Sequence, residues 1–290
     1  MEVGNEMAAE TKGGFVEKLQ HVDRRILYLV LAVLVAIPLI WPFTLPLQVS
    51  PAVYSLYDHV ESLKSGDVVL MSFDYSAGGA PDIHPQVEAI VRHLAKKDGV
   101  GLVTVGFFPD GPMFAEKVFW ILEEAGKTYG EDFVNLGYRA GGEGAIAMLA
   151  SDVKAAFQTD FRGNDTSSLP LLQKVKSARD FSLIIEFAGG SPGPPEWIRQ
   201  VQAVYRVPLA VGISTSMVPA NMPFLESGQL ISILSGLRGA AEYEVLLGEA
   251  GKGSAAMSSQ TLGHLVIMVF LIVGNVSYFL TRKNSSRRIS

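Results

Sequence analysis

The hydrophobic and polar positions divide the chain into three parts, because two long uncharged apolar runs enclose a stretch of mixed composition. The runs are Ile26–Leu47 and Leu262–Leu280. A helix rises about 1.5 Å per residue, so roughly 20 apolar residues cross a hydrocarbon core about 30 Å thick. The pattern therefore predicts two transmembrane helices, at residues 26–47 and 261–281, on either side of a domain at residues 48–260.

Inside the central domain, short continuous apolar runs alternate with amphipathic stretches. The apolar runs predict strands at residues 68–73, 102–107, 133–136, 183–187 and 209–214. The amphipathic stretches predict helices at residues 85–97, 113–127, 143–157, 196–205 and 224–247. Buried strands separated by helices are typical of parallel sheets covered on both faces. We predict a three-layer, Rossmann-like α/β domain with a mostly parallel sheet of about five strands.

Basic residues flank both apolar runs on their outer sides. They are Lys12, Lys18, Arg24 and Arg25 before the first run and Arg282, Lys283, Arg287 and Arg288 after the second. Because positive residues near span ends stay on the cytoplasmic side, the N-terminal segment 1–25 and the basic tail 282–290 are expected there. The central domain is then expected to be extracytoplasmic.

The first run has an alternative interpretation as a cleaved signal peptide. Small residues lie at positions 47–52, although the apolar core is longer than such peptides usually have and begins late. Pro38, Pro42 and Pro46 follow one another at intervals of four residues. Each proline removes a backbone donor, so we expect them to kink or end the helix.

Composition excludes some classes of function. The chain has no cysteine, so its domain must be stable without disulfides. The formal net charge is −5, and acidic residues outnumber basic ones between the apolar runs. Nucleic-acid binding requires a concentrated basic face, so we predict no nucleic-acid partner.

Polar residues follow several predicted strands, at the edge of a parallel sheet where ligands usually bind. Asp74 and Asp110 follow the first two strands, and Ser214 ends the fifth. The two aspartates are candidates for acid–base or ligand groups, and the alternative is that they cap the next helix. Ser214 is a candidate nucleophile or ligand group by its position alone.

The turn after the third predicted strand is rich in glycine. Gly141, Gly142 and Gly144 allow close backbone approach, and Arg139 stands just before them. Because this turn leads into a helix, it is a candidate anion site. The alternative is an ordinary strand-to-helix connection, since the sequence matches neither the dinucleotide fingerprint nor the phosphate loop.

Small residues recur every four positions along the predicted helix 224–247. They are Gly228, Ser232, Gly236 and Ala240. Such a stripe allows another backbone to approach, either from the domain's own sheet or from a neighbouring subunit. In the second apolar run, Asn275 is expected to face a partner helix, because polar side chains inside spans usually do.

No complete catalytic constellation is present in the sequence. The five histidines lack zinc-ligand spacing, and no GxSxG motif precedes a predicted helix, so we predict no metal and no cofactor. The favoured hypothesis is a membrane-anchored, non-enzymatic subunit whose extracytoplasmic α/β domain acts in assembly or binding. Its expected partners are the lipid bilayer and either further copies of itself or other membrane subunits. The alternative is a membrane-tethered hydrolase or small-ligand sensor that uses the strand-end loops.

Overall fold

The computed structural model describes residues 23–287, which divide into two compact units. The α/β unit comprises Thr44–Ser254, and the helical unit comprises the described residues on either side of it. Most of the expected cytoplasmic segment 1–25 lies outside the described residues, as do the last three residues of the expected tail 282–290.

The α/β unit contains a six-stranded sheet in the order β3-β2-β1-β4-β5-β6, with every neighbouring pair parallel. The strands are β1 (Val68–Asp74), β2 (Gly101–Gly106), β3 (Phe133–Tyr138), β4 (Leu183–Ala188), β5 (Leu209–Ile213) and β6 (Ser232–Ser235). The predicted α/β class and parallel sheet are confirmed. The chain proceeds outward from β1 in one direction and from β4 in the other, so the strand order reverses between β1 and β4.

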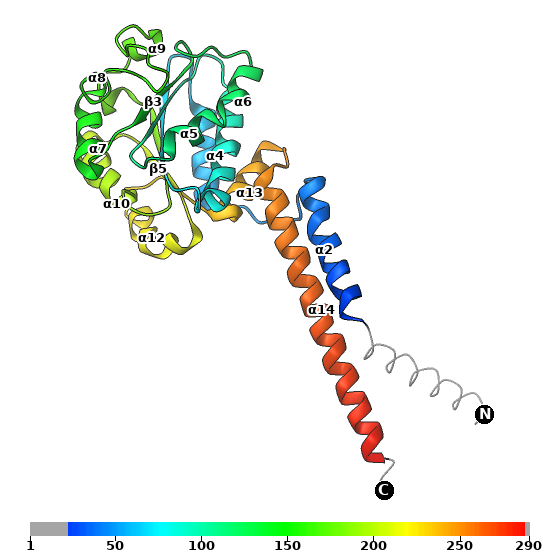
Figure 1. Cartoon of the computed structure of the whole chain (residues 1–290). Coiled ribbons are helices and arrows are strands. Elements are labelled where there is room, and N and C mark those ends of the chain that lie inside the picture. The colour runs from blue at the N-terminus through cyan, green and yellow to red at the C-terminus, as the bar shows by residue number, and fades with distance from the viewer. Residues whose placement is uncertain (1–22, 288–290) are drawn as a thin grey trace. The chain divides into compact units, whose positions relative to one another are not determined.

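Helices cover both faces of the sheet, as Figure 1 shows. One face packs against α3 (Pro51–Ser62), α4 (Ala80–Ala95), α5 (Gly111–Glu116), α6 (Phe119–Glu124) and α13 (Gly236–Leu247). The other face packs against α7 (Gly142–Ser151), α8 (Val153–Ala156), α9 (Pro170–Gln173), α10 (Pro194–Trp197) and the π-helical turn η2 (Ile198–Gln202). The remaining short elements are η1 (Ala178–Asp180), α11 (Ala203–Tyr205), η3 (Thr215–Met217) and α12 (Val218–Glu226). Strand side chains alternate between two buried clusters, which explains the continuous apolar runs.

The sixth strand corrects the sequence-based prediction for residues 224–247. A single helix was expected there, but α12 ends at Glu226, β6 follows and α13 begins at Gly236. Gly228 has φ +74° and Gly236 has φ +49°, a left-handed conformation that interrupts a right-handed helix. The four-residue spacing of small residues therefore falls on a turn, a strand and a helix rather than along one helical face.

The expected small-residue packing face consequently does not exist as one surface. Ser232 lies inside β6, and Gly236 and Ala240 are buried within the α/β unit. A Cβ atom at Gly236 would lie 2.4 Å from Oγ1 of Thr215 and 2.6 Å from Oδ1 of Asp82. These residues therefore serve the close packing of the domain itself.

The helical unit contains α2 (Arg24–Ile40) and most of α14 (Lys252–Arg287), which lie side by side in Figure 1. Oγ of Ser259 donates to the backbone carbonyl of Val35 at 2.9 Å, and Oγ of Ser258 donates to that of Phe43 at 2.8 Å. Pro38 lies within α2, which ends just before Pro42. Within the first apolar run, residues 26–47, only residues 26–40 are helical.

By length and composition, one described helix can cross a membrane, over Lys252–Phe279, and an 18-residue stretch of it has a mean hydropathy of 2.0. The apolar helix α2 has 17 residues and is shorter than the span expected from the sequence. Nδ2 of Asn275 donates to the carbonyl of Leu271, four positions earlier on its own helix, at 2.8 Å. The expected contact of Asn275 with a partner helix stays a prediction.

Candidate functional site at the end of strand β3

A groove of about 600 Å³ lies beside the carboxyl end of β3, one of the two edge strands of the sheet. One wall is formed by residues 136–139, and the other by residues 155–161, which begin at the end of α8 and continue beyond it. Its volume is within the range of small-ligand sites. Among the predicted site residues, the groove contains Arg139.

A β-bulge shapes the first wall. Thr104 pairs with Asn135 and Gly106 pairs with Tyr138, so β3 has one residue more than β2 between these pairs. Gly137 has φ +93°, which a side chain would strain. Bulges bend edge strands and redirect side chains, and this one precedes Arg139 directly.

Asn135, which is fully buried, holds the bulge in place. Its Oδ1 accepts the Gly137 amide at 3.1 Å, and its Nδ2 donates to the carbonyl of Pro112 at 3.1 Å and to Oε1 of Glu116 at 2.9 Å. Oε2 of Glu116 then accepts from Nη2 of Arg162 at 2.8 Å. The amide of one side chain therefore joins the bulge to α5 and to the opposite loop.

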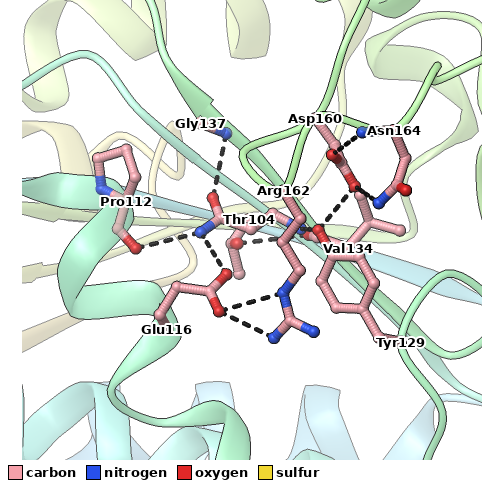
Figure 2. A network of polar contacts seen from close by, with 10 residues as sticks. Thr104, Pro112, Glu116, Tyr129, Val134, Gly137, Asp160, Arg162 and Asn164 are labelled. Carbon is pink, nitrogen blue, oxygen red and sulfur yellow. Dashed lines mark hydrogen bonds and ion pairs between the residues drawn. The ribbon is translucent and has the colours of Figure 1, made fainter.

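Asp160 holds the second wall (Figure 2). Its carboxylate accepts from the Tyr129 hydroxyl at 2.8 Å and from the backbone amide and Nδ2 of Asn164 at 2.7 and 3.0 Å. The Phe161 amide donates to the carbonyl of Asn135 at 2.8 Å. These bonds cover part of the exposed edge of β3, which is how parallel sheets avoid pairing with other chains.

Arg139 is half-buried in this groove. Its Nη1 donates to the carbonyl of Ala156, and its guanidinium lies 6.0 Å from the ring centroid of Phe157. A guanidinium has five N–H donors. Among the described residues, the other four donors of Arg139 have no protein acceptor.

The glycine turn after Arg139 was expected to bind an anion, but an acidic side chain of the protein lies at this turn. Gly141 has φ +124° and Gly142 has φ +52°, and both precede or begin α7, while Gly144 faces open space. Glu143 in the first turn forms a two-bond ion pair with Arg199, 2.9 and 2.8 Å long. Arg199 lowers the pKa of Glu143 to about 2, so the start of α7 already carries a carboxylate.

The two strand-end aspartates do not cap the next helix. Asp74 is buried, and its carboxylate accepts from Oγ of Ser72 and from the amide of Phe107, both at 2.6 Å. Asp110 occupies the N-cap position of α5 but accepts from the amide of Ala77 at 3.0 Å. Both side chains join neighbouring strand-end loops, and neither lines the groove.

Burial raises the pKa of Asp74 to about 6, although its hydrogen bonds oppose the shift. Glu186 pairs in register with Ser72 across β4 and β1, and neither of its carboxylate oxygens has a partner among the described residues. Burial, reinforced by the Asp74 charge, holds the pKa of Glu186 well above its usual range. Glu186 is the single acidic residue in the apolar run of β4, which indicates a buried carboxyl group, and the sequence analysis did not consider it.

Ser214 lies at the far side of the sheet from the groove, after β5. Its Oγ is 3.1 Å from Oγ of Ser216, and within residues 23–287 no histidine or lysine forms a hydrogen bond with either hydroxyl. The carboxylate of Asp82 accepts the amide of Leu237 at 3.2 Å, which places it at a loop junction. No group of acidic, histidine or cysteine side chains that would hold a metal occurs in the described part of the chain.

No protein-family model matches the chain, and no curated protein matches its sequence. The residues that form the groove, apart from Arg139, were not predicted from sequence. Asn135, Glu116 and Asp160 come from separate segments, and only the fold brings them together.

Proposed function

We propose that this protein is a membrane-anchored subunit whose α/β unit is extracytoplasmic and acts in binding or assembly, with both termini in the cytoplasm. The observation that carries the proposal is the apolar surface of the helical unit. Most of the large hydrophobic side chains that are exposed in the described residues lie on α2 and α14. Examples are Leu29, at 64 % exposed, and Ile272, at 63 %.

Such a surface favours contact with lipid. Soluble proteins rarely expose contiguous apolar patches of this kind, and burial of apolar area stabilises an inserted helix by about 25 cal/mol per Å². The flanking Arg and Lys residues support the cytoplasmic assignment of both ends. The bilayer is the first partner in this proposal, and a second copy of the chain or another membrane subunit is the next.

A binding role is favoured over hydrolysis by the state of the strand-end groups. Asp74 is buried and its carboxylate is hydrogen-bonded. The carboxylates of Asp110 and Asp82 each accept a hydrogen bond from a backbone amide. In the described part of the chain, the Ser214 hydroxyl hydrogen-bonds to Ser216 and to no histidine or lysine. The groove with Arg139 is instead accessible and holds a cation with free donors.

Replacing Leu271 and Ile272 with lysine tests membrane insertion. Each lysine near the centre of a span costs about 2.5–3.5 kcal/mol on insertion, so the variant should move from the membrane fraction to the soluble or aggregated fraction. Val204→Lys, at an exposed apolar position of the α/β unit, is the matched control and should stay with the membrane. A wild-type chain that is soluble without detergent, or a double variant that still resists alkaline extraction, would contradict the proposal.

A further inference from the structure

The ligand class of the groove follows from the chemistry of its lining. The acidic and basic side chains in the lining are Asp160 and Arg139. Asp160 is 5 % exposed, and its carboxylate accepts three hydrogen bonds from Tyr129 and Asn164. Arg139 is therefore the charged group with unused hydrogen-bonding capacity.

The position of Arg139 is fixed on both sides. Its backbone amide donates to the carbonyl of Gly106 at 3.1 Å, and its Nη1 donates to the carbonyl of Ala156. The bulge at Gly137, which Asn135 holds in place, sets the position of Arg139 at the end of the strand. A positioned guanidinium loses little freedom on binding, and its planar set of donors fits carboxylate and phosphate oxygens.

Two exposed aromatic side chains lie at the same groove. Tyr138 is 43 % exposed and Phe161 is 46 % exposed, and both belong to the lining. A Cβ atom built at Gly137 would lie 3.7 Å from Cβ of Phe161, so this side chain lies against the bulge. Exposed rings beside a cation offer contact area for the apolar part of a ligand.

We propose that the groove binds a small organic anion, its carboxylate or phosphate held by Arg139 and its apolar or aromatic body in contact with Tyr138 and Phe161. This inference deepens the proposed function, because it rests on the α/β unit being a binding domain. It does not depend on membrane insertion, so loss of ligand binding and loss of anchoring are separate results.

Calorimetric titration of the full-length chain in nanodiscs tests the inference. The probes are phenyl phosphate and benzoate as aromatic anions, inorganic phosphate as an anion without a ring, and benzyl alcohol as a neutral aromatic compound. We expect at least one aromatic anion to bind the wild-type chain at millimolar concentration or below. Benzyl alcohol should bind at least about tenfold more weakly, since a charge-assisted hydrogen bond contributes at least that factor.

Three variants distinguish the parts of the site. Arg139→Gln should weaken binding of the aromatic anion about tenfold or more. Tyr138→Ala should weaken the aromatic anion while leaving inorganic phosphate unchanged. Ala155→Trp keeps Arg139 but fills the groove from an exposed position, and it should abolish binding without lowering the melting temperature.

Arg179→Gln is the matched control, because Arg179 also lies beside an aromatic ring, 5.6 Å from the centroid of Tyr205, but outside the groove. It should bind as the wild type does. Absence of binding by both aromatic anions, equal binding of benzyl alcohol, or unchanged affinity in Arg139→Gln and Ala155→Trp would overturn the inference.

Discussion

Glu242 and Glu244, two residues apart on α13, hold the two places where the chain enters and leaves the α/β unit. Oε2 of Glu242 accepts the amide of Ser50, at the start of α3, at 2.9 Å. The carboxylate of Glu244 accepts the amides of Gly251, Gly253 and Ser254, at the start of α14, at 3.0, 2.9 and 2.7 Å. Both end segments of the α/β unit are therefore held by the same helix, α13.

Replacing Glu244 with alanine should destabilise the chain by about 1.5–3 kcal/mol, because buried backbone donors at the start of α14 lose a charged acceptor. Glu244 is 3 % exposed, so water replaces the carboxylate poorly. Thermal unfolding of the full-length chain in detergent measures the effect. Glu249→Ala removes an exposed ion pair with Lys96 and should change stability little, and equal losses in both variants would contradict the capping role.

The buried carboxyl of Asp74 predicts that stability falls as the pH rises. Its pKa is about 6 in the folded chain and near 3.8 when unfolded, so the folded state holds the proton more tightly. The contribution to stability is full below about pH 4 and is lost between about pH 4 and pH 6, on the order of 3 kcal/mol in all. Unfolding midpoints measured across this range should decline in the wild type and decline less in Asp74→Asn. An equally steep decline in the variant would show that another group is responsible.

Glu186 offers a stabilising substitution. Both of its carboxylate oxygens are buried without partners, so Glu186→Met should remove an unsatisfied polar group at similar volume. We expect a gain of about 1–3 kcal/mol in the free energy of unfolding at neutral pH. Glu186→Gln, which removes the charge but not the polar burial, should gain less. A loss of stability in Glu186→Met would mean that Glu186 makes an interaction absent from the described contacts.

Substitution at Gly236 separates domain packing from assembly. Gly236→Leu places a side chain at φ +49° against Thr215 and Asp82, so it should destabilise the domain by more than about 1–3 kcal/mol. The oligomeric mass of the fraction that remains folded should not change. Gly228→Leu, also at positive φ but in open space, is the control for backbone strain and should cost less. A variant that loses oligomer mass without losing stability would restore the assembly face predicted from sequence.

Sequence periodicity predicted the strands β1 to β5, because each is a short, mainly apolar run between helices. It missed β6, since Ser232 and the glycines at 228 and 236 imitate a helical repeat, and only pairing with β5 shows that residues 232–235 are extended. The length of the apolar run extended the first apolar helix past Ile40, whereas the prolines correctly indicated that the helix ends early. Local hydrophobicity does not show which strands pair or where the backbone conformation ends a helix.

The candidate site was predictable only in part. Arg139 was found from its place after a strand, but the groove depends on Asn135, whose partners come from α5 and the β3 bulge. The expected anion site at the glycine turn did not take into account Glu143 and Arg199, which are 56 residues apart and form an ion pair there. Contacts between distant segments cannot be read from the spacing of residues in one sequence.

Site-specific labelling of single cysteines tests the central claim most directly, because the natural chain has no cysteine. The account predicts that Lys174→Cys, at an exposed position of the α/β unit, reacts with a membrane-impermeant thiol reagent added to intact cells. Ser286→Cys, near the end of α14, should react only after the cells are lysed. Labelling of Ser286→Cys but not Lys174→Cys in intact cells, or equal labelling of both before lysis, would contradict a membrane-anchored protein with an extracytoplasmic α/β domain.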